Sequence, residues 1–363
     1  MVLILKPTLS CNFRCKYCYL SEDTKTQNKF DVEFAKTLLL QVKDCLLKNK
    51  QRIEFLWHGG EPLMWGMDNY VEIFAFIEKE FVGTDYRISI QTNLSLIDND
   101  FIDLFLKYNV SVGFSLDGIK EIHDCQRVDS KGNGTFDTIM EKVTLCKQRK
   151  LNLGCIVVAS KKHLGHIPEL YKFMCDNKIG FKLNPLFNSG EAKKNIDDFG
   201  LTPNEYAKLS IELFDLWFYD TENKNYNSKF IDVASSLITR KTSLCSFGKN
   251  CQDNFLCVAP NCDVVPCGRF CDSELINFSY GNLLKESLEE ILSKRKLSDA
   301  YNRNKYIEAG NCKKCRFFDI CHGGCLHDGF ISGGNFKTKT FLCGAYKKIF
   351  SHIERRLRET EML

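Results

Sequence analysis

The first half of the chain alternates short apolar runs with longer stretches in which apolar residues recur every three or four positions. The short runs predict strands at 3–6, 53–57, 87–91, 111–115, 152–158 and 180–184. The longer stretches predict amphipathic helices at 32–47, 69–81, 98–107, 135–149 and 164–177. Six repeats of strand and helix indicate an α/β fold with a parallel sheet, which right-handed crossovers would curl into a partial (β/α)6 barrel. In such folds the chemistry lies at the carboxyl ends of the strands.

The pattern changes after residue 185. Residues 186–202 are polar and predict a connector, and two helical stretches follow at 203–219 and 229–239. From residue 245 onward the chain is rich in cysteine and short of long periodic segments, with helices expected at 285–296 and 344–358. We therefore expect three parts: a partial barrel (1–200), a helical connector (201–244) and a cysteine-rich domain (245–363). Bound metal would supply part of the stability of the third, which cannot bury a large core unaided.

Composition is that of an ordinary soluble protein, with 44% apolar and 26% charged residues among 363. The net charge of +4 is spread along the chain without a basic stripe, so nucleic acid is not an expected partner. No apolar run has the length of a membrane span, and the apolar opening stops at Lys6-Pro7, too early for a signal peptide. We expect a cytoplasmic protein that does not bind membranes.

Cysteine is the exception to this ordinary composition, with 19 residues. Thiols stay reduced in the cytoplasm, where clustered cysteines indicate metal ligands rather than disulfides. Three cysteines lie in residues 11–18 and eleven in residues 245–343. The remaining five are widely spaced and are expected to be core residues: Cys45, Cys125, Cys146, Cys155 and Cys175.

The first group has the spacing Cys11-x3-Cys15-x2-Cys18 and follows the first predicted strand directly. Three thiolates can hold three irons of a cubane and leave the fourth iron open to a substrate. A zinc site that lacks a fourth ligand is the alternative. The segment Cys-Asn-Phe-Arg-Cys-Lys-Tyr-Cys resembles the signature loop of the radical S-adenosylmethionine (SAM) superfamily. In that superfamily the open iron chelates the amino and carboxylate groups of SAM.

Further motifs of this superfamily end successive predicted strands. Gly59-Gly60-Glu61-Pro62 ends the second strand, Gln91-Thr92-Asn93 the third and Ser115-Leu116-Asp117-Gly118 the fourth. A carboxylate such as that of Glu61 suits the methionine ammonium group. The resemblance implies that SAM is bound by Gly59, Gly60, Glu61, Gln91, Asn93, Ser115 and Asp117, and that Arg127 meets its carboxylate.

The C-terminal cysteines follow the order Cys312-x2-Cys315-x5-Cys321-x3-Cys325, then Cys343, with Cys245-x5-Cys251 and the turn Pro266-Cys267-Gly268 upstream. This layout resembles the SPASM extension of radical SAM peptide and protein maturases, which carries two more four-iron clusters. The resemblance implies a first auxiliary cluster on Cys245, Cys251, Cys267 and Cys325, and a second on Cys312, Cys315, Cys321 and Cys343. The expected cofactors are thus SAM and three [4Fe-4S] clusters, with a zinc ribbon at 312–325 as the alternative.

Three more cysteines match no ligand position: Cys257, Cys262 and Cys271. They could be alternative ligands, a site of covalent chemistry or small buried hydrophobic residues.

The overall frame resembles anaerobic sulfatase-maturating enzymes, which oxidise a serine or cysteine to formylglycine. Those enzymes carry an aspartate directly after the proline–cysteine turn as the proton acceptor, and Gly268 stands there in this chain. Formylglycine formation would need another acid, such as Asp272 or Asp263. The segments Cys267-Gly268-Arg269-Phe270 and Tyr280-Gly281-Asn282-Leu283 instead resemble maturases of ribosomally made peptides, notably those that form cyclophanes, with thioether-forming enzymes as neighbours.

We therefore predict a radical SAM maturase that takes a hydrogen atom from a peptide by means of a 5′-deoxyadenosyl radical and forms an intramolecular crosslink. Arg269 and Asp272 are predicted to face the substrate. An external donor resembling flavodoxin or ferredoxin would supply one electron, and the auxiliary clusters would receive the surplus electron. Because the chain starts at its first strand, the peptide would be captured by the barrel mouth and the SPASM surface, or by a separate protein. A non-catalytic iron–sulfur electron-transfer protein is a further alternative, but it would not explain the strand-end motifs.

Overall fold

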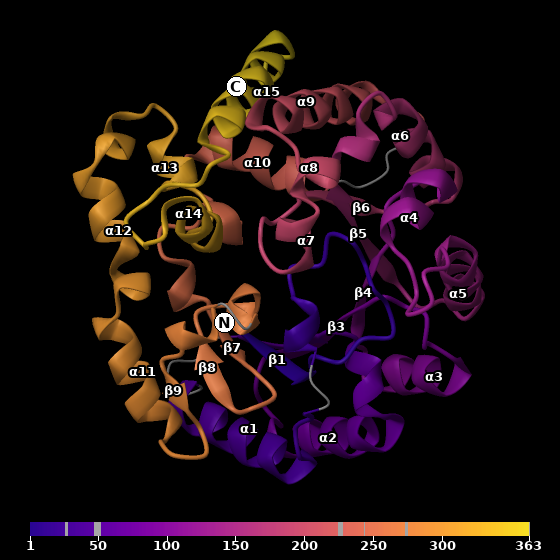
Figure 1. The fold of residues 1–363 in the computed structure, drawn as a ribbon, viewed down its shortest axis with the longest axis vertical. Coiled ribbons are helices and arrows are strands. Elements are labelled where there is room, and N and C mark those ends of the chain that lie inside the picture. Colours follow the sequence, from indigo (N-terminus) through magenta and orange to yellow (C-terminus); the bar gives the residue numbers. More distant parts are fainter. Residues whose placement is uncertain (26–27, 47–51, 224–227, 243, 273–274, 363) are drawn as a thin grey trace.

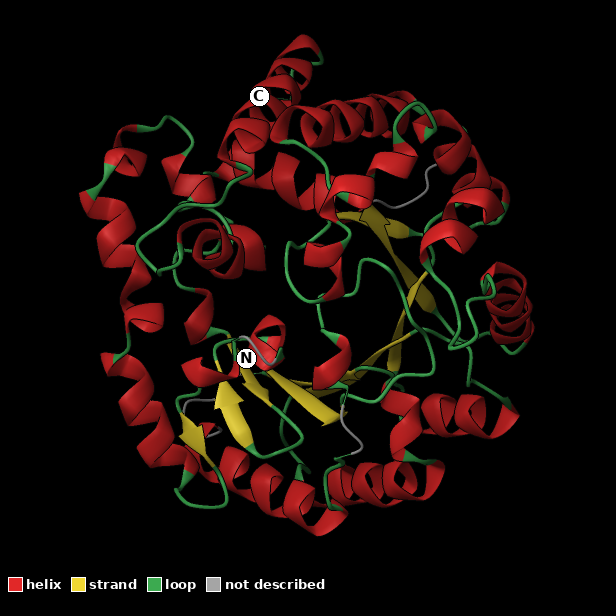
Figure 2. Cartoon of the chain, viewed as in Figure 1, coloured by secondary structure: helices red, strands yellow, loops and turns green. Residues whose placement is uncertain are grey.

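A continuous sheet forms the centre of the fold. The computed structural model describes residues 1–25, 28–46, 52–223, 228–242, 244–272 and 275–362. Within these residues the sheet has nine strands in the order β6-β5-β4-β3-β2-β1-β7-β8-β9, and helices surround it as an outer ring (Figure 1, Figure 2). No helix of this described part is long and apolar enough to cross a membrane.

Six parallel strands confirm the predicted partial barrel. They are β1 (Val2–Thr8), β2 (Ile53–Gly59), β3 (Tyr86–Thr92), β4 (Ser111–Ser115), β5 (Leu153–Ala159) and β6 (Phe181–Pro185). The helices on their outer side are α1 (Val32–Leu46), α2 (Met67–Glu80), α3 (Asn99–Lys107), α4 (Lys120–Gln126), α5 (Phe136–Gln148) and α6 (Ile167–Asp176). In β2 the residues Ile53, Phe55 and Trp57 are fully buried while those between them are half-buried, the alternation expected of a strand.

The sheet continues beyond the barrel into the C-terminal part of the chain. β7 (Phe255–Val258) pairs parallel with β1, and β8 (Asp263–Val265) and β9 (Gly281–Asn282) extend the sheet antiparallel. Sequence patterning missed these strands because they have only two to four residues. The predicted domain boundaries at residues 200 and 244 stay a prediction. The sheet is continuous across them, because β7, β8 and β9 lie beyond residue 244 and extend the barrel strands.

The described part of the C-terminal region contains more regular structure than the sequence indicated. Its helices are α11 (Leu288–Leu297), α12 (Asp299–Ala309), α13 (Phe318–Cys321), α14 (Leu326–Gly333) and α15 (Cys343–Glu359). The expectation of few periodic segments is wrong for α12, which buries Arg303 together with Ala300 and Ile307. Arg303 donates to Gly323 O and Gly324 O at 3.1 Å, so a residue typical of a surface lies on the inner face.

Residues 186–202, which were predicted as a polar connector, contact the loop that carries Cys11, Cys15 and Cys18. They contain the short helices α7 (Glu191–Lys194) and α8 (Ile196–Phe199), and lead into α9 (Pro203–Tyr219) and α10 (Ser228–Thr239). Ala192 N donates to Cys18 O at 3.0 Å. Gly190 has φ +55°, and a Cβ placed on it would lie 2.5 Å from backbone atoms of Tyr19 and Leu20. This close approach explains a glycine here.

Replacing Gly190 by alanine tests this packing. Gly190→Ala adds strain at positive φ and a backbone overlap, so the free energy of unfolding should fall by about 2–4 kcal/mol. Gly165→Ala is the matched control, because Gly165 has φ +82° but open space around its Cβ position. The control should lose only about 1 kcal/mol in urea denaturation. Equal losses in the two variants would contradict the role of Gly190 in holding the loop.

Candidate active site

A cavity of about 370 Å³ lies at the carboxyl ends of the parallel strands. Two groups of cysteines face it from different parts of the chain: Cys11, Cys15 and Cys18, and Cys245, Cys251, Cys267 and Cys325. A second cavity of about 110 Å³ is lined by Cys312, Cys315, Cys321 and Cys343. The structure therefore groups the cysteines as the resemblance implied, with Cys325 apart from its sequence neighbours. Their role as ligands stays a prediction.

These cysteines surround cavities instead of meeting at a point. In the described part of the chain, no group of three or more cysteine, histidine or acidic side chains is arranged to hold a single metal ion. Burial raises the pKa of Cys11 to about 12 and also raises the pKa values of Cys15 and Cys18. The metal-free thiols are thus protonated at neutral pH, and metal binding would release protons. A thiolate-bound cluster that fills the cavity fits this donor set.

Backbone contacts fix the loop that presents the first three cysteines. Arg14 N donates to Val128 O at 2.8 Å, and Lys16 N donates to Gln126 O at 2.9 Å. Phe13 N approaches the Cys11 sulfur at 3.4 Å. The loop is thereby joined to the end of α4 and to the residues that follow it.

Arg127 is the best-placed residue for a ligand carboxylate. It is 6% exposed and lines the cavity, and its Nη1 donates to the Tyr17 hydroxyl at 2.6 Å. Its Nε is buried and has no hydrogen-bond partner. An unpaired buried donor is costly, and a carboxylate would satisfy it. The SAM carboxylate therefore fits here, as the sequence predicted.

Asp117 lies behind this wall and does not line the cavity. Its Oδ2 accepts from Tyr17 Oη at 2.5 Å and from Gln126 Nε2 at 2.9 Å, and its Oδ1 accepts from Val158 N at 3.1 Å. The structure thus gives Asp117 the role of orienting Tyr17, which in turn contacts Arg127. The predicted place of Asp117 near the SAM ribose or methionine stays a prediction.

Glu61 is likewise fully buried behind the cavity wall. Its carboxylate accepts from Thr92 Oγ1 and Asn93 N, both at 2.7 Å, and from Leu63 N at 3.0 Å. Burial raises its pKa to about 6 despite these donors. Glu61 therefore fixes the end of β3 through these hydrogen bonds, and its predicted contact with the SAM ammonium stays a prediction. The predicted SAM residues that do line the cavity are Gly59, Gly60, Gln91, Asn93, Ser115 and Arg127.

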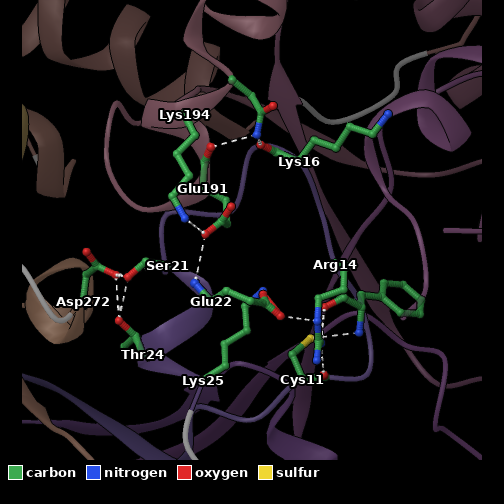
Figure 3. A network of polar contacts seen from close by, with 12 residues as sticks. Cys11, Arg14, Lys16, Ser21, Glu22, Thr24, Lys25, Glu191, Lys194 and Asp272 are labelled. Atoms are coloured by element: carbon green, nitrogen blue, oxygen red, sulfur yellow. Dashed lines mark hydrogen bonds and ion pairs between the residues drawn. The ribbon is translucent and has the colours of Figure 1, made fainter. Parts of the chain in front are cut away.

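The two residues predicted to face the substrate differ in position. Arg269 lines the cavity, where its Nη1 donates to the Cys325 sulfur at 3.1 Å. Asp272 is 1% exposed and points away, toward the loop after Cys18 (Figure 3). Its Oδ1 accepts from Ser21 N at 2.7 Å and from Thr24 Oγ1 at 3.0 Å. These donors hold the carboxylate in the protein interior, and the predicted role of Asp272 toward the substrate stays a prediction.

A buried charge pair escaped the sequence analysis. Lys6 is fully buried in β1, and its Nζ donates to Tyr19 Oη at 2.8 Å and to Gly268 O at 2.5 Å. The sulfur atoms of Cys257 and Cys271 lie 3.8 Å apart. A hydrogen bond from Cys257, followed by the charge of Lys6, lowers the pKa of Cys271 to about 7. Both cysteines are buried in the core, and their role stays open. The lysine within an apolar strand was the available signal for this cluster.

Two neutral imidazoles also line the cavity and were missed. Burial lowers the pKa of His58 to about 3, and it lowers the pKa of His327 as well. Neither ring nitrogen of His327 has a hydrogen-bond partner, although its Nδ1 lies 3.6 Å from Asp328 Oδ1. No aspartate or glutamate of the described residues lines this cavity. The imidazoles are therefore its available proton acceptors.

Known protein families match both halves of this arrangement. Residues 5–174 match the radical SAM superfamily, and residues 245–316 match the iron–sulfur cluster-binding SPASM domain. The chain is a radical SAM enzyme with a SPASM domain. This confirms the predicted fold class and excludes the non-catalytic alternative. It also supports SAM and iron–sulfur clusters as cofactors, while the number of clusters stays a prediction.

Relatives of this radical SAM enzyme modify proteins. It is 28% identical to the cysteine-type anaerobic sulfatase-maturating enzyme of Clostridium novyi (strain NT), over 96% of this chain and 94% of the relative. The structure of native anSMEcpe with bound AdoMet and Kp18Cys peptide is 25% identical, with a TM-score of 0.83 over 99% of this chain and 98% of that chain. Streptococcus suis SuiB bound to precursor peptide SuiA shares the fold at 18% identity, with a TM-score of 0.60 over 94% and 75%.

Removing one of the first three thiols tests the assignment of the site. Cys15→Ala leaves the open-iron cluster one ligand short, so reductive formation of 5′-deoxyadenosine should fall to background, and about four irons per chain should be lost. The control is Cys125→Ala, since Cys125 donates to Ile122 O outside the cavity lining. Continued 5′-deoxyadenosine formation by the Cys15 variant would disprove the assignment.

Histidine burial near the site predicts acid sensitivity. The Nδ1 of His123 accepts from Asp117 N at 3.3 Å, and burial lowers the pKa of His123 to about 4. The unfolded chain binds the proton from about pH 6.5, so stability is lost as the pH falls from about 6.5 to 4. His123→Gln should remove about 2 kcal/mol of the stability difference between pH 7 and pH 5 in urea denaturation. The exposed control His166→Gln should retain it, and an unchanged slope in His123→Gln would contradict the prediction.

Proposed function

We propose that this enzyme takes a hydrogen atom from a ribosomally made peptide and joins two of its side chains by a cyclophane carbon–carbon bond or a thioether. The observation that carries the proposal is the absence of a carboxylate among the described residues that line the cavity. Position 268 is glycine, and Asp272 is held by Ser21 and Thr24. Asp263 binds Asn261 and Asn282 at the far end of the sheet. Neither acid can take the proton that formylglycine formation releases.

The residues of the cavity serve mainly to position reactants. When bound at the first three cysteines, the cluster and SAM supply a 5′-deoxyadenosyl radical. Arg127 would hold the SAM carboxylate, since its Nε is otherwise unpaired. Apolar side chains close the remaining wall and keep water from the reacting carbon: Ile156, Val158, Phe187, Phe255 and Leu326. His58 and His327, both neutral, are placed to accept the proton that the crosslinked product loses.

The other parts of the proposal follow from the same site. Three [4Fe-4S] clusters would occupy the two cavities, with the ligand sets that the sequence predicted. A flavodoxin-like or ferredoxin-like donor would supply the first electron. We place the protein in the cytoplasm, where reduced thiols can hold such clusters, with no role for nucleic acid or membranes.

Formylglycine formation is the second candidate, and the similarity to sulfatase-maturating enzymes along the whole chain favours it. It would require an imidazole, His58 or His327, in place of the missing aspartate. Both candidates would therefore use an imidazole as the proton acceptor, and the chemical change in the product peptide is what distinguishes them.

Product analysis tests the two functions. The enzyme, reconstituted with iron and sulfide, is incubated anaerobically with SAM, dithionite and a candidate precursor peptide from the neighbourhood of its gene. A crosslinking enzyme should give a peptide that has lost two hydrogens per site, contains a linked pair resistant to fragmentation and does not react with a hydrazine reagent. A sulfatase-derived peptide is the matched substrate for the other function. A hydrazine-reactive aldehyde on that peptide, with the neighbouring peptide unchanged, would overturn the crosslinking proposal.

A further inference from the structure

Arg269 contacts a predicted cluster ligand and is fixed by groups on three sides. It lies in the short turn Gly268–Cys271, next to the predicted ligand Cys267. Its Nη1 donates to the Cys325 sulfur at 3.1 Å and lies 3.5 Å from Asp328 Oδ1. The centre of its guanidinium group stands 3.4 Å from the ring centre of Phe187. The stacking and the carboxylate hold the group in place before any cluster binds.

The acidic partner of Arg269 is itself held rigidly. Asp328 lies in the first turn of α14, and its side chain is only 3% exposed. Cys325 is the residue at which the same helix begins. The sulfur and the carboxylate therefore move together, and Arg269 sits between them on the side of the cavity. A lysine at position 269 could not maintain this arrangement, because its ammonium group lacks the planar array of donors that a guanidinium group has.

This arrangement bears on the reduction potential of a cluster. Hydrogen bonds to cluster sulfurs and nearby positive charge stabilise the reduced, more negative state. A buried carboxylate acts in the opposite direction. In the low-dielectric interior both effects are weakly screened, since little water separates the groups.

We propose that Arg269 and Asp328 set, in opposite directions, the reduction potential of the cluster held by Cys325, and so make this cluster the acceptor of the substrate's surplus electron. This rests on the proposed function. After the new bond forms, the product radical loses one electron and one proton. The cluster at Cys325 gains the electron, and a neutral imidazole of the wall takes the proton. The second auxiliary site is in a separate cavity that Arg269 does not line.

Potentiometric titration followed by electron paramagnetic resonance tests the proposal on the reconstituted enzyme without peptide. Added SAM identifies the signal of the N-terminal cluster, which leaves the two auxiliary signals. Arg269→Gln should lower the midpoint potential of one auxiliary cluster, and Asp328→Asn should raise the potential of the same cluster. Arg269→Lys should fall between Arg269→Gln and the parent. Lys347→Gln is the matched control, because it removes a charge that lines the second cavity, and it should leave the Cys325 cluster unchanged.

Iron and sulfide contents equal to the parent establish that each variant holds its clusters. If the Arg269→Gln variant loses iron or sulfide, the potential measured for Asp328→Asn alone tests the proposal. Unchanged potentials, or shifts of the same sign in Arg269→Gln and Asp328→Asn, would overturn the proposal. In turnover with the peptide, Arg269→Gln should form more 5′-deoxyadenosine per product. Because the potentials are measured without peptide, a wrong substrate leaves the opposite shifts intact, whereas a wrong role for Arg269 abolishes them.

Discussion

The structure depends on bringing seven cysteines together around one cavity at the mouth of a parallel sheet. Burial raises the pKa of Cys267 to about 11 and that of Cys325 to about 12. Such thiols bind protons tightly until a metal displaces them, so cluster binding and the final packing are linked equilibria. The linkage involves β1, β7 and α14 together, because the cysteines come from distant parts of the chain. It explains how a region with short strands and small helices can be stable.

Polar residues behind the cavity wall hold its lining in place. Glu61 braces the end of β3, and Asp117 orients Tyr17 against Arg127. Asp272 joins the loop after Cys18 to the C-terminal part through Ser21. In each case a buried carboxylate accepts several hydrogen bonds, as it must in order to be tolerated inside a protein. The chemistry is thus left to thiols, backbone and a few cations and imidazoles.

The sequence predicted those parts in which a local pattern is sufficient. Each barrel strand was predicted to within two residues at either end, because apolar runs between helices identify buried parallel strands. The N-terminal cysteine group was predicted from its spacing and its position after the first strand, whereas the grouping of Cys325 with Cys245 and the role of Arg127 were implied only by the family resemblance. The direction in which a carboxylate points depends on distant partners, so the sequence did not indicate the hydrogen bonds that hold Asp272, Glu61 and Asp117. The pair of Lys6 with Cys271 was missed for the same reason, since the two lie 265 positions apart.

Gly268 lies beside Lys6, at the position where sulfatase-maturating enzymes carry their proton acceptor. A Cβ on Gly268 would lie 3.3 Å from Lys6 Cε and 3.7 Å from Lys6 Nζ. An aspartate there, as in sulfatase-maturating enzymes, would place its carboxylate beside this ammonium group. In this chain Lys6 Nζ donates to Tyr19 Oη and Gly268 O, and the nearby Cys271 contributes to raising the pKa of Lys6. A cation buried in β1 requires polar or anionic partners, and the aspartate that could supply one at position 268 is absent from this chain.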